Sequence, residues 1–216
     1  LWQESWERYP ALGCQPRQSS LEWIFPSGAR IKFAHLQLDT DRYAWKGAEI
    51  ALLELDQAEQ FTEDQFWFLL TANRSVSGVR PYVRLGCNPA LEDDPVGGWL
   101  HSLLSWWLDE ATGEPRWDRA GTLRWFLRQA SDEIAWADDQ ATLGPGAKSL
   151  TFIPGRVEDN LILTRADPSY VATLRALPYV ERLRAFGNWK VRPMAGKVFN
   201  RAWFEIVDAA PAEAVR

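Results

Sequence analysis

The feature that most constrains the fold is an apolar run at residues 50–55 that ends abruptly at Asp56. Residues 64–74 follow with helical spacing behind Thr62, a possible cap, and residues 82–85 return as a β-prone run. A strand, a helix and a strand in this order predict a parallel pair joined by a crossover. Because a central parallel strand is apolar on both faces and ends at the ligand-binding edge of α/β proteins, we expect Asp56 at such an edge.

Short strands and helices are predicted in the rest of the chain. Residues 21–24 and 30–33 are β-prone and flank a Pro-Ser-Gly turn, which indicates a hairpin. A helix is predicted at 97–108, and its apolar face would carry Trp99, Leu103 and Trp106. Further strands are predicted at 123–127, 133–136 and 150–153, and further helices at 168–175 and 180–186.

Composition limits the classes of function. The 216 residues are 46% hydrophobic and carry a formal charge of −5, which excludes a protein that binds nucleic acid through a generally basic surface. Cys14 and Cys87 are far apart and show no metal-ligand spacing, which suits a reducing compartment. The sequence contains no stretch of the ~20 apolar residues that a membrane span needs, and no signal peptide. We expect a soluble intracellular protein without a membrane partner.

Short segments along nearly the whole chain follow the order and spacing of one known family. They are residues 25–31, 45–50, 56–63, 80–84, 88–89, 123–126, 149–154, 158–160, 187–189, 195–199 and 203–204. No single segment is specific. Together they resemble the large terminase subunit of tailed bacteriophages, the motor that packages DNA into the capsid, in the branch whose Walker B segment is an apolar strand followed by Asp-Glu.

The resemblance implies an α/β fold: a P-loop NTPase (RecA/ASCE-like) parallel sheet with flanking helices, followed by a small helical lid or linker subdomain. Residues 1–155 would be the C-terminal portion of the ATPase domain, 156–194 the helical subdomain, and 195–216 the start of a linker or nuclease domain. The complete protein would use Mg²⁺ and ATP in the cytoplasm of the bacterial host. Its implied partners are double-stranded DNA, the terminase small subunit, the phage portal or prohead, and further copies in a homo-oligomeric ring.

The same resemblance implies roles for individual residues. Asp56 matches the Walker B metal ligand, and Gly86 and Asn88 match the coupling motif beside the γ-phosphate. Taken alone, Asp56 is equally well explained as a residue that ends a strand, and Asn88 before Pro89 as a strand-ending turn. The chain departs from the family at Gln57, where the family has a Glu that polarises the attacking water.

Gln57 predicts weak or absent hydrolysis, because an amide can orient water but cannot accept its proton, and loss of a general base costs on the order of 10²–10⁴ in rate. Three explanations stay open: an introduced trap, a natural inactive variant, or replacement by a nearby carboxylate. Glu54 lies back inside the strand, where it needs an edge position or a cation such as Arg84 or Lys32. Glu59 lies just past the strand end and is the better placed substitute.

A complete motor also needs a phosphate-binding loop of the form G-x-x-x-x-G-K-[ST] between a strand and a helix. Residues 144–149 contain Gly, Lys and Ser, but with the wrong spacing, and predict an ordinary turn. We expect the loop upstream of a fragment whose parent is an ATPase with a downstream endonuclease, and we expect the isolated chain to be inactive. The alternative is a non-catalytic module that binds DNA or terminase partners without a complete nucleotide site.

Overall fold

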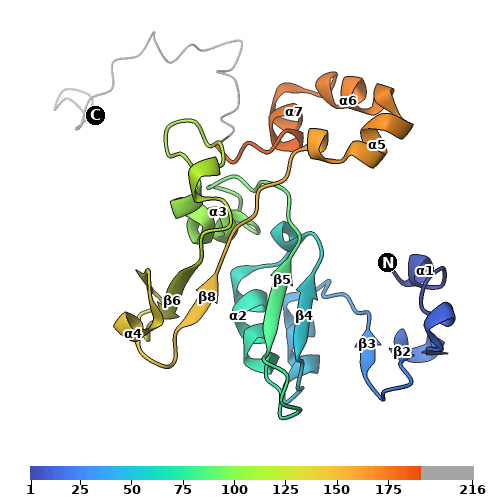
Figure 1. Cartoon of the computed structure of the whole chain (residues 1–216). Coiled ribbons are helices and arrows are strands. Elements are labelled where there is room, and N and C mark those ends of the chain that lie inside the picture. Colours follow the sequence, from blue (N-terminus) through green and yellow to red (C-terminus); the bar gives the residue numbers. More distant parts are fainter. Residues whose placement is uncertain (191–216) are drawn as a thin grey trace, which may run out of the picture. The chain divides into compact units, whose positions relative to one another are not determined.

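The computed structural model describes residues 1–190, which form a mixed α/β protein with three small sheets (Figure 1). The chain folds as two compact units. Unit 1 comprises Leu1–Leu52 and Asp64–Tyr82, and unit 2 comprises Leu53–Glu63 and the chain from Val83 onward. Across the described part of the chain, no helix is both long and apolar enough to cross a bilayer.

Unit 1 begins with an antiparallel sheet of order β1-β2-β3, built around a single tryptophan. The elements are α1 (Trp2–Ser5), β1 (Gln15–Arg17), β2 (Glu22–Ile24) and β3 (Arg30–Lys32). Trp23 on β2 is completely buried, and its indole Nε1 donates to Ser5 Oγ at 2.8 Å. The rings of Trp2, Trp6 and Tyr9 pack around it with centroids 4.9 to 5.6 Å away. The predicted hairpin is confirmed.

The predicted strand, helix and strand are also present, as β4 (Leu52–Leu55), α2 (Glu63–Ala72) and β5 (Tyr82–Leu85). The two strands pair with each other. Their pairing is parallel, because the N–H of Tyr82 donates to the carbonyl of Ala51 at 3.0 Å and the N–H of Gly86 donates to that of Leu55 at 2.9 Å. The carboxyl ends of both strands therefore lie at one edge.

The parallel sheet is smaller than the P-loop NTPase prediction requires. Within residues 1–190, β4 pairs only with β5, and the other two sheets are antiparallel. Leu53 and Leu55 are buried, whereas Leu52 and Glu54 are exposed. The prediction of a strand buried on both faces is wrong here, because the face of β4 that carries Leu52 and Glu54 is left uncovered. Exposed Glu54 consequently needs no cation to offset burial.

A buried side-chain amide holds the amino-terminal end of this strand pair through hydrogen bonds. Asn73 follows α2, and its Nδ2 donates to the carbonyl of Ile50 at 3.0 Å and to that of Tyr82 at 3.1 Å. One side chain thus satisfies carbonyls at the start of both strands. The sequence predicts a helix face with Phe66, Leu69, Leu70 and Asn73. Three of these residues are buried, and Leu70 is half-buried.

Unit 2 contains α3 (Gly98–Leu104), which continues as a 3-10 turn over Ser105–Trp107. The predicted helix is therefore confirmed, but its apolar face is corrected at one position: Trp107 is completely buried, and Trp106 is only half-buried. The tighter 3-10 turn has three residues per turn, which places Trp107 in line with buried Leu104.

An antiparallel sheet of order β7-β6-β8 follows in unit 2. Its elements are β6 (Arg124–Arg128), β7 (Ile134–Ala137), α4 (Gln140–Leu143) and β8 (Lys148–Leu150). The strand predicted at 150–153 is wrong in its bounds, because Leu150 already pairs with Arg124, the first residue of β6, and the ladder ends there. Residues 144–147 form the predicted turn, and a strand rather than a helix follows them.

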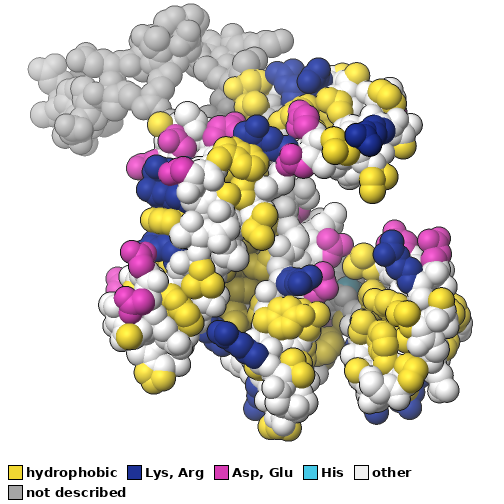
Figure 2. Space-filling model, in the orientation of Figure 1, with side chains coloured by type: hydrophobic (Ala, Val, Ile, Leu, Met, Phe, Trp, Pro, Cys, Tyr) yellow, Lys and Arg dark blue, Asp and Glu magenta, His cyan; other side chains and the backbone are white. Residues whose placement is uncertain are grey.

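Short helices then form a layer of their own: α5 (Leu161–Ala166), α6 (Pro168–Arg175) and α7 (Tyr179–Ala185). The helix predicted at 168–175 is confirmed as α6, and the one at 180–186 begins and ends one residue earlier as α7. Figure 2 shows hydrophobic side chains among the basic residues of this layer, where Leu161 and Ile162 are 55% and 86% exposed. Residues 195–216, expected to start a linker or nuclease domain, lie outside the described residues.

Short 3-10 helices connect these elements, at Pro10–Leu12, Gln18–Ser20, Asp39–Trp45, Ala58–Gln60, Trp117–Arg119 and Val157–Asp159.

The last described residues are held by a loop of unit 2, at residues 109–116. The Nδ2 of Asn188 donates to the carbonyl of Thr112 and to Glu114 Oε1, both at 3.0 Å, and the N–H of Trp189 donates to the carbonyl of Gly113 at 2.9 Å. Asn188 and Trp189 are buried. Gly113 has a φ of +74° and lies against the backbone of Lys190, so that no side chain fits there. We call this arrangement the exit clasp.

Replacing Asn73 tests the role of its amide. Asn73→Ala leaves buried carbonyls without their donor, and we expect a loss of about 1–3 kcal/mol in the free energy of unfolding. Asn73→Asp should lose more at neutral pH, since a carboxylate would face two carbonyl oxygens. Its pKa would be raised in the folded state, so the Asp variant should regain stability as the pH falls.

Urea unfolding of the full-length protein at neutral and acidic pH measures both effects. Asn160→Asp is the matched control, because Asn160 Oδ1 accepts from the N–H of Leu163 at the start of α5 and Asp fills the same capping role. Equal losses for Asn73→Asp and Asn160→Asp would contradict the assigned role.

Candidate functional site

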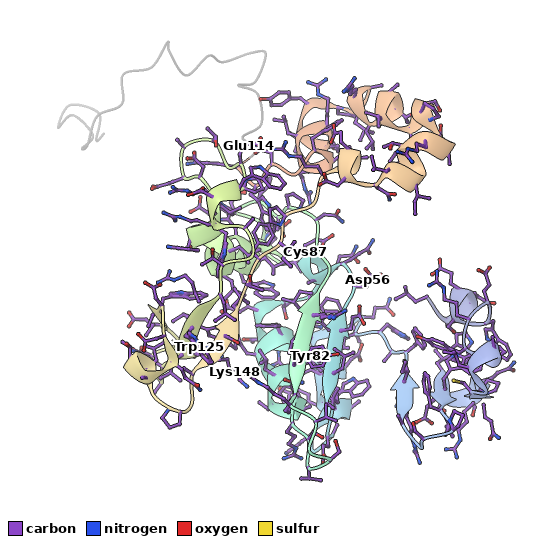
Figure 3. All side chains as sticks on the ribbon, in the orientation of Figure 1. Asp56, Tyr82, Cys87, Glu114, Trp125 and Lys148 are labelled. Carbon is purple, nitrogen blue, oxygen red and sulfur yellow. The ribbon has the colours of Figure 1, made fainter. Side chains whose placement is uncertain are left out.

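The carboxyl edge of β4 and β5 is fixed by the backbone of Gly86. Its N–H donates to the carbonyl of Leu55 at 2.9 Å, and its carbonyl accepts from the N–H of Ala58 at 2.8 Å. Ala58 is completely buried. Gly86 and Asp56 are neighbours, since a Cβ added at Gly86 would lie 3.7 Å from Asp56 Oδ1. Figure 3 shows Asp56 and Cys87 beyond the same end of the two strands.

Gln57 occupies an unusual backbone conformation directly after Asp56. Its φ of 54° and ψ of 56° are left-handed, a region that residues with a side chain rarely adopt and that occurs more often at functional sites. The turn starts the 3-10 helix Ala58–Gln60. The side-chain carbonyl of Gln57 accepts from Gln60 Nε2 at 2.7 Å, which leaves the amide group of Gln57 at the exposed edge.

Two of the predicted site residues, Glu59 and Asn88, bind each other. The backbone N–H of Asn88 donates to Glu59 Oε2 at 3.0 Å, and Asn88 Nδ2 donates to Glu59 Oε1 at 2.9 Å. Both carboxylate oxygens are therefore occupied by one residue, in hydrogen bonds that the negative charge strengthens. This pair joins the segment after β4 to the segment after β5.

Cys87 lies between Gly86 and Asn88, and sequence reasoning assigned it no role at this edge. Burial raises the pKa of the Cys87 thiol to about 11, and the negative charge of Glu59 adds to the shift. The thiol is consequently neutral at physiological pH. Because the pKa of the thiol in the unfolded chain is close to its ordinary value of 9.0, this group should reduce stability as the pH rises from about 9 to about 11.

The start of α3 packs against the segment that follows β4 at the carboxyl edge. A Cβ added at Gly97 would lie 2.6 Å from the backbone carbonyl oxygen of Glu59, so the two backbones approach more closely than any side chain permits. Trp99 Nε1 donates to the carbonyl of Phe61 at 2.8 Å. Asp94 Oδ1 accepts from the N–H of Gly97 at 3.0 Å and that of Val96 at 2.9 Å. These backbone hydrogen bonds lower the pKa of Asp94.

A residue that sequence reasoning missed reaches the edge from α7. Arg184 Nε donates to the carbonyl of Pro89 at 2.9 Å. The two residues are 95 positions apart, and neither periodicity nor spacing could have paired them.

Asp56 is suited to a cation that phosphate oxygens already hold. Its side chain is exposed, and within residues 1–190 it accepts no hydrogen bond, so its oxygens are available. The described residues contain no group of three or more His, Cys, Asp or Glu that could hold a metal ion unaided. Mg²⁺ is commonly bound through one or two carboxylates plus substrate phosphates and water, which is a fit for this single carboxylate beside Gly86.

The effect of the negative charge of Glu59 on the pKa of the Cys87 thiol can be measured. Glu59→Gln keeps an acceptor for Asn88 but removes the negative charge, so the pKa of Cys87 should fall while burial keeps it above its ordinary value. The rate of Cys87 alkylation by iodoacetamide at pH 9, followed by peptide mass spectrometry, should therefore rise. Cys14, which is buried in unit 1, is the internal control. An unchanged rate would show that Glu59 does not lie against Cys87.

The close approach at Gly97 gives a stability prediction. Gly97→Ala should cost about 1–3 kcal/mol in the free energy of unfolding, because the new methyl group meets the backbone of Glu59. Gly155→Ala is the matched control, since a Cβ there would have no atom within 4 Å, and we expect a change within about 0.5 kcal/mol. Urea unfolding compares the two, and equal costs would refute the packing described here.

Comparison with known proteins identifies the family of the chain. Residues 10–206 match the family described as "Terminase large subunit, T4likevirus-type, N-terminal". Neither the curated proteins nor the solved structures gave a match. The family match extends over more than half of the chain and includes every site residue described above. The chain therefore belongs to the T4-like terminase large subunits and represents their N-terminal, ATPase part.

Proposed function

We propose that this chain contributes the Walker B and coupling segments to an ATP-driven motor that packages viral DNA into a phage prohead. The observation that carries the proposal is the double hydrogen bond between Glu59 and Asn88 at the carboxyl edge of two parallel strands. It links the segment after the Asp56 strand to the segment that resembles the family's coupling motif. A rearrangement of either segment would therefore displace the other through the Glu59–Asn88 pair.

Asp56 is the proposed ligand for Mg²⁺ carried by ATP, either directly or through water. Bound in this way, the ion would bridge phosphate oxygens and neutralise the charge that develops on them. Gly86 leaves the space beside the Asp56 carboxylate open, which permits close approach of a ligand. The site also needs a phosphate-binding loop, and the 216 residues contain no sequence of that form.

Gln57 is the proposed water-orienting residue, in the position of the expected catalytic Glu. Its left-handed turn presents the side chain at the edge, and the contact with Gln60 restrains it. Since the amide cannot accept a proton, hydrolysis is slow unless another base assists. Glu59 is the proposed substitute, but it must first leave Asn88, which holds both of its oxygens.

We also propose a P-loop NTPase fold of the RecA/ASCE type. In this fold, residues 1–155 belong to the ATPase domain, 156–194 form a helical lid or linker, and 195–216 start a linker or nuclease domain. The proposed partners are double-stranded DNA, the terminase small subunit, the portal or prohead, and further copies in a ring. The proposed location is the cytoplasm of the bacterial host.

Gln57 supports a second candidate function. A chain that lacks the catalytic Glu can act as a non-catalytic module that binds DNA or terminase partners. The two candidates differ in one respect, which is whether restoring the carboxylate at position 57 produces an ATPase.

The test measures ATP hydrolysis by a complete protein in which this chain is joined to the expected phosphate-binding loop. Gln57→Glu should raise the rate by on the order of 10²–10⁴, because it supplies a general base at a position where Gln60 Nε2 can still donate to it. Adding Asp56→Ala to this variant should abolish the gain. Gln129→Glu makes the same chemical change at an exposed position in unit 2 and should leave the rate unchanged.

Other outcomes assign the site differently. Hydrolysis that is insensitive to Gln57→Glu but lost in Glu59→Gln would make Glu59 the base. Absence of Mg·ATP binding in every variant would overturn the motor proposal and favour the non-catalytic module.

A further inference from the structure

Arg184 on α7 contacts the segment that carries Asn88. Its Nε donates to the carbonyl of Pro89 at 2.9 Å, and Pro89 directly follows Asn88 and is buried. A buried carbonyl that loses its donor is costly, so this hydrogen bond restrains the segment. Arg184 itself is half-buried and thus holds a defined position.

The same guanidinium faces the segment that supports Glu59. The positive charge of Arg184 contributes to lowering the pKa of Asp94, after the two backbone hydrogen bonds that Asp94 accepts. Asp94 fixes the N–H of Gly97, and Gly97 lies against the backbone of Glu59. One side chain of α7 therefore hydrogen-bonds the segment that carries Asn88 and interacts electrostatically with Asp94, which holds the support of Glu59.

Helix α7 is also fixed at its end. Gly187, with a φ of +90°, ends the helical run, and Asn188 enters the exit clasp immediately afterwards. Arg184 lies one helical turn before this point. α7 is thus attached at its end to the clasp and, through Arg184, to the carboxyl edge.

We propose that Arg184 is a positioning residue that connects helix α7 to the Glu59–Asn88 pair, so that a rearrangement of the pair on nucleotide binding moves the helix. This inference rests on the proposed function for the nucleotide-dependent step. The attachment itself is independent of any ligand and can be tested without one.

Arg182 provides a matched control on the same helix. Its Nη1 donates to the carbonyl of Arg175 at 3.4 Å, and its guanidinium lies 5.7 Å from the ring centroid of Tyr179. Among the described residues 1–190, these contacts of the Arg182 side chain are with α6 and α7. Arg184→Met and Arg182→Met each keep a long unbranched stem and remove the donors and the charge. Arg184→Lys keeps the charge and an ammonium donor but loses the Nε that contacts Pro89.

The first experiment measures the attachment in the full-length protein without nucleotide. Cys87, two residues before Pro89, is protected by burial, so its alkylation by iodoacetamide requires local opening. Arg184→Met should increase that rate roughly tenfold, the factor expected for the loss of one hydrogen bond to a part-buried acceptor. Arg184→Lys should give an intermediate rate. Arg182→Met should match the unaltered protein, and Cys14 should not change in any variant.

The second experiment measures transmission, by hydrogen exchange of the α7 amides with and without Mg·ATP. In the unaltered protein, and in Arg182→Met, Mg·ATP should change the exchange of residues 179–186. In Arg184→Met, Mg·ATP should still bind, as measured by equilibrium binding, but the exchange of these amides should no longer respond.

The outcomes separate the two proposals. If Cys87 reacts at the same rate in Arg184→Met and Arg182→Met, or if α7 responds to Mg·ATP without Arg184, the positioning role is overturned. If Mg·ATP does not bind even the unaltered protein, the proposed motor function fails, and the alkylation rates still decide whether Arg184 holds the edge.

Discussion

The arrangement of the candidate site depends on two backbone hydrogen bonds of Gly86. One is the last bond of the parallel pairing between β4 and β5, and the other turns the chain after β4 by holding the N–H of Ala58. Asp56 and Gln57 lie within this turn, and Asn88 follows Gly86 closely. Because these bonds are made by the backbone, they fix the positions of the polar side chains without using any of them. The carboxylates and amides of the edge are left for each other or for a ligand.

Local pattern predicted the elements of this protein better than their contacts. β5 and α6 have the bounds that the sequence predicts, because alternation and a capped helix start depend on neighbours along the chain. Trp106 was placed on the buried face in error, since a change from α to 3-10 geometry shifts the helix phase and leaves no clear trace in the sequence. The strand at 150–153 was displaced for a similar reason: its end depends on where β6 begins.

The candidate site shows the same division. Asp56, Gly86 and Asn88 were found by type and position, and the structure brings Gly86 to Asp56 and Asn88 to Glu59. The sequence suggested Glu59 as an isolated substitute base and could not indicate that Asn88 occupies both of its oxygens. The contact between Arg184 and Pro89 spans 95 positions and depends on how α7 packs within unit 2, which no local signal encodes. Family membership explains why these segments occur together.

The exit clasp has a mechanical consequence. Asn188 and Trp189 make three hydrogen bonds with consecutive residues of one loop, and both side chains are buried. A tension applied to the chain beyond Lys190 would load these bonds together, instead of breaking them one after another. The clasp would also deliver that tension to the body of unit 2 and shield the short helices α5 to α7 from it. A force on residues 188–190 would therefore be shared among these bonds and passed to the loop at residues 109–116.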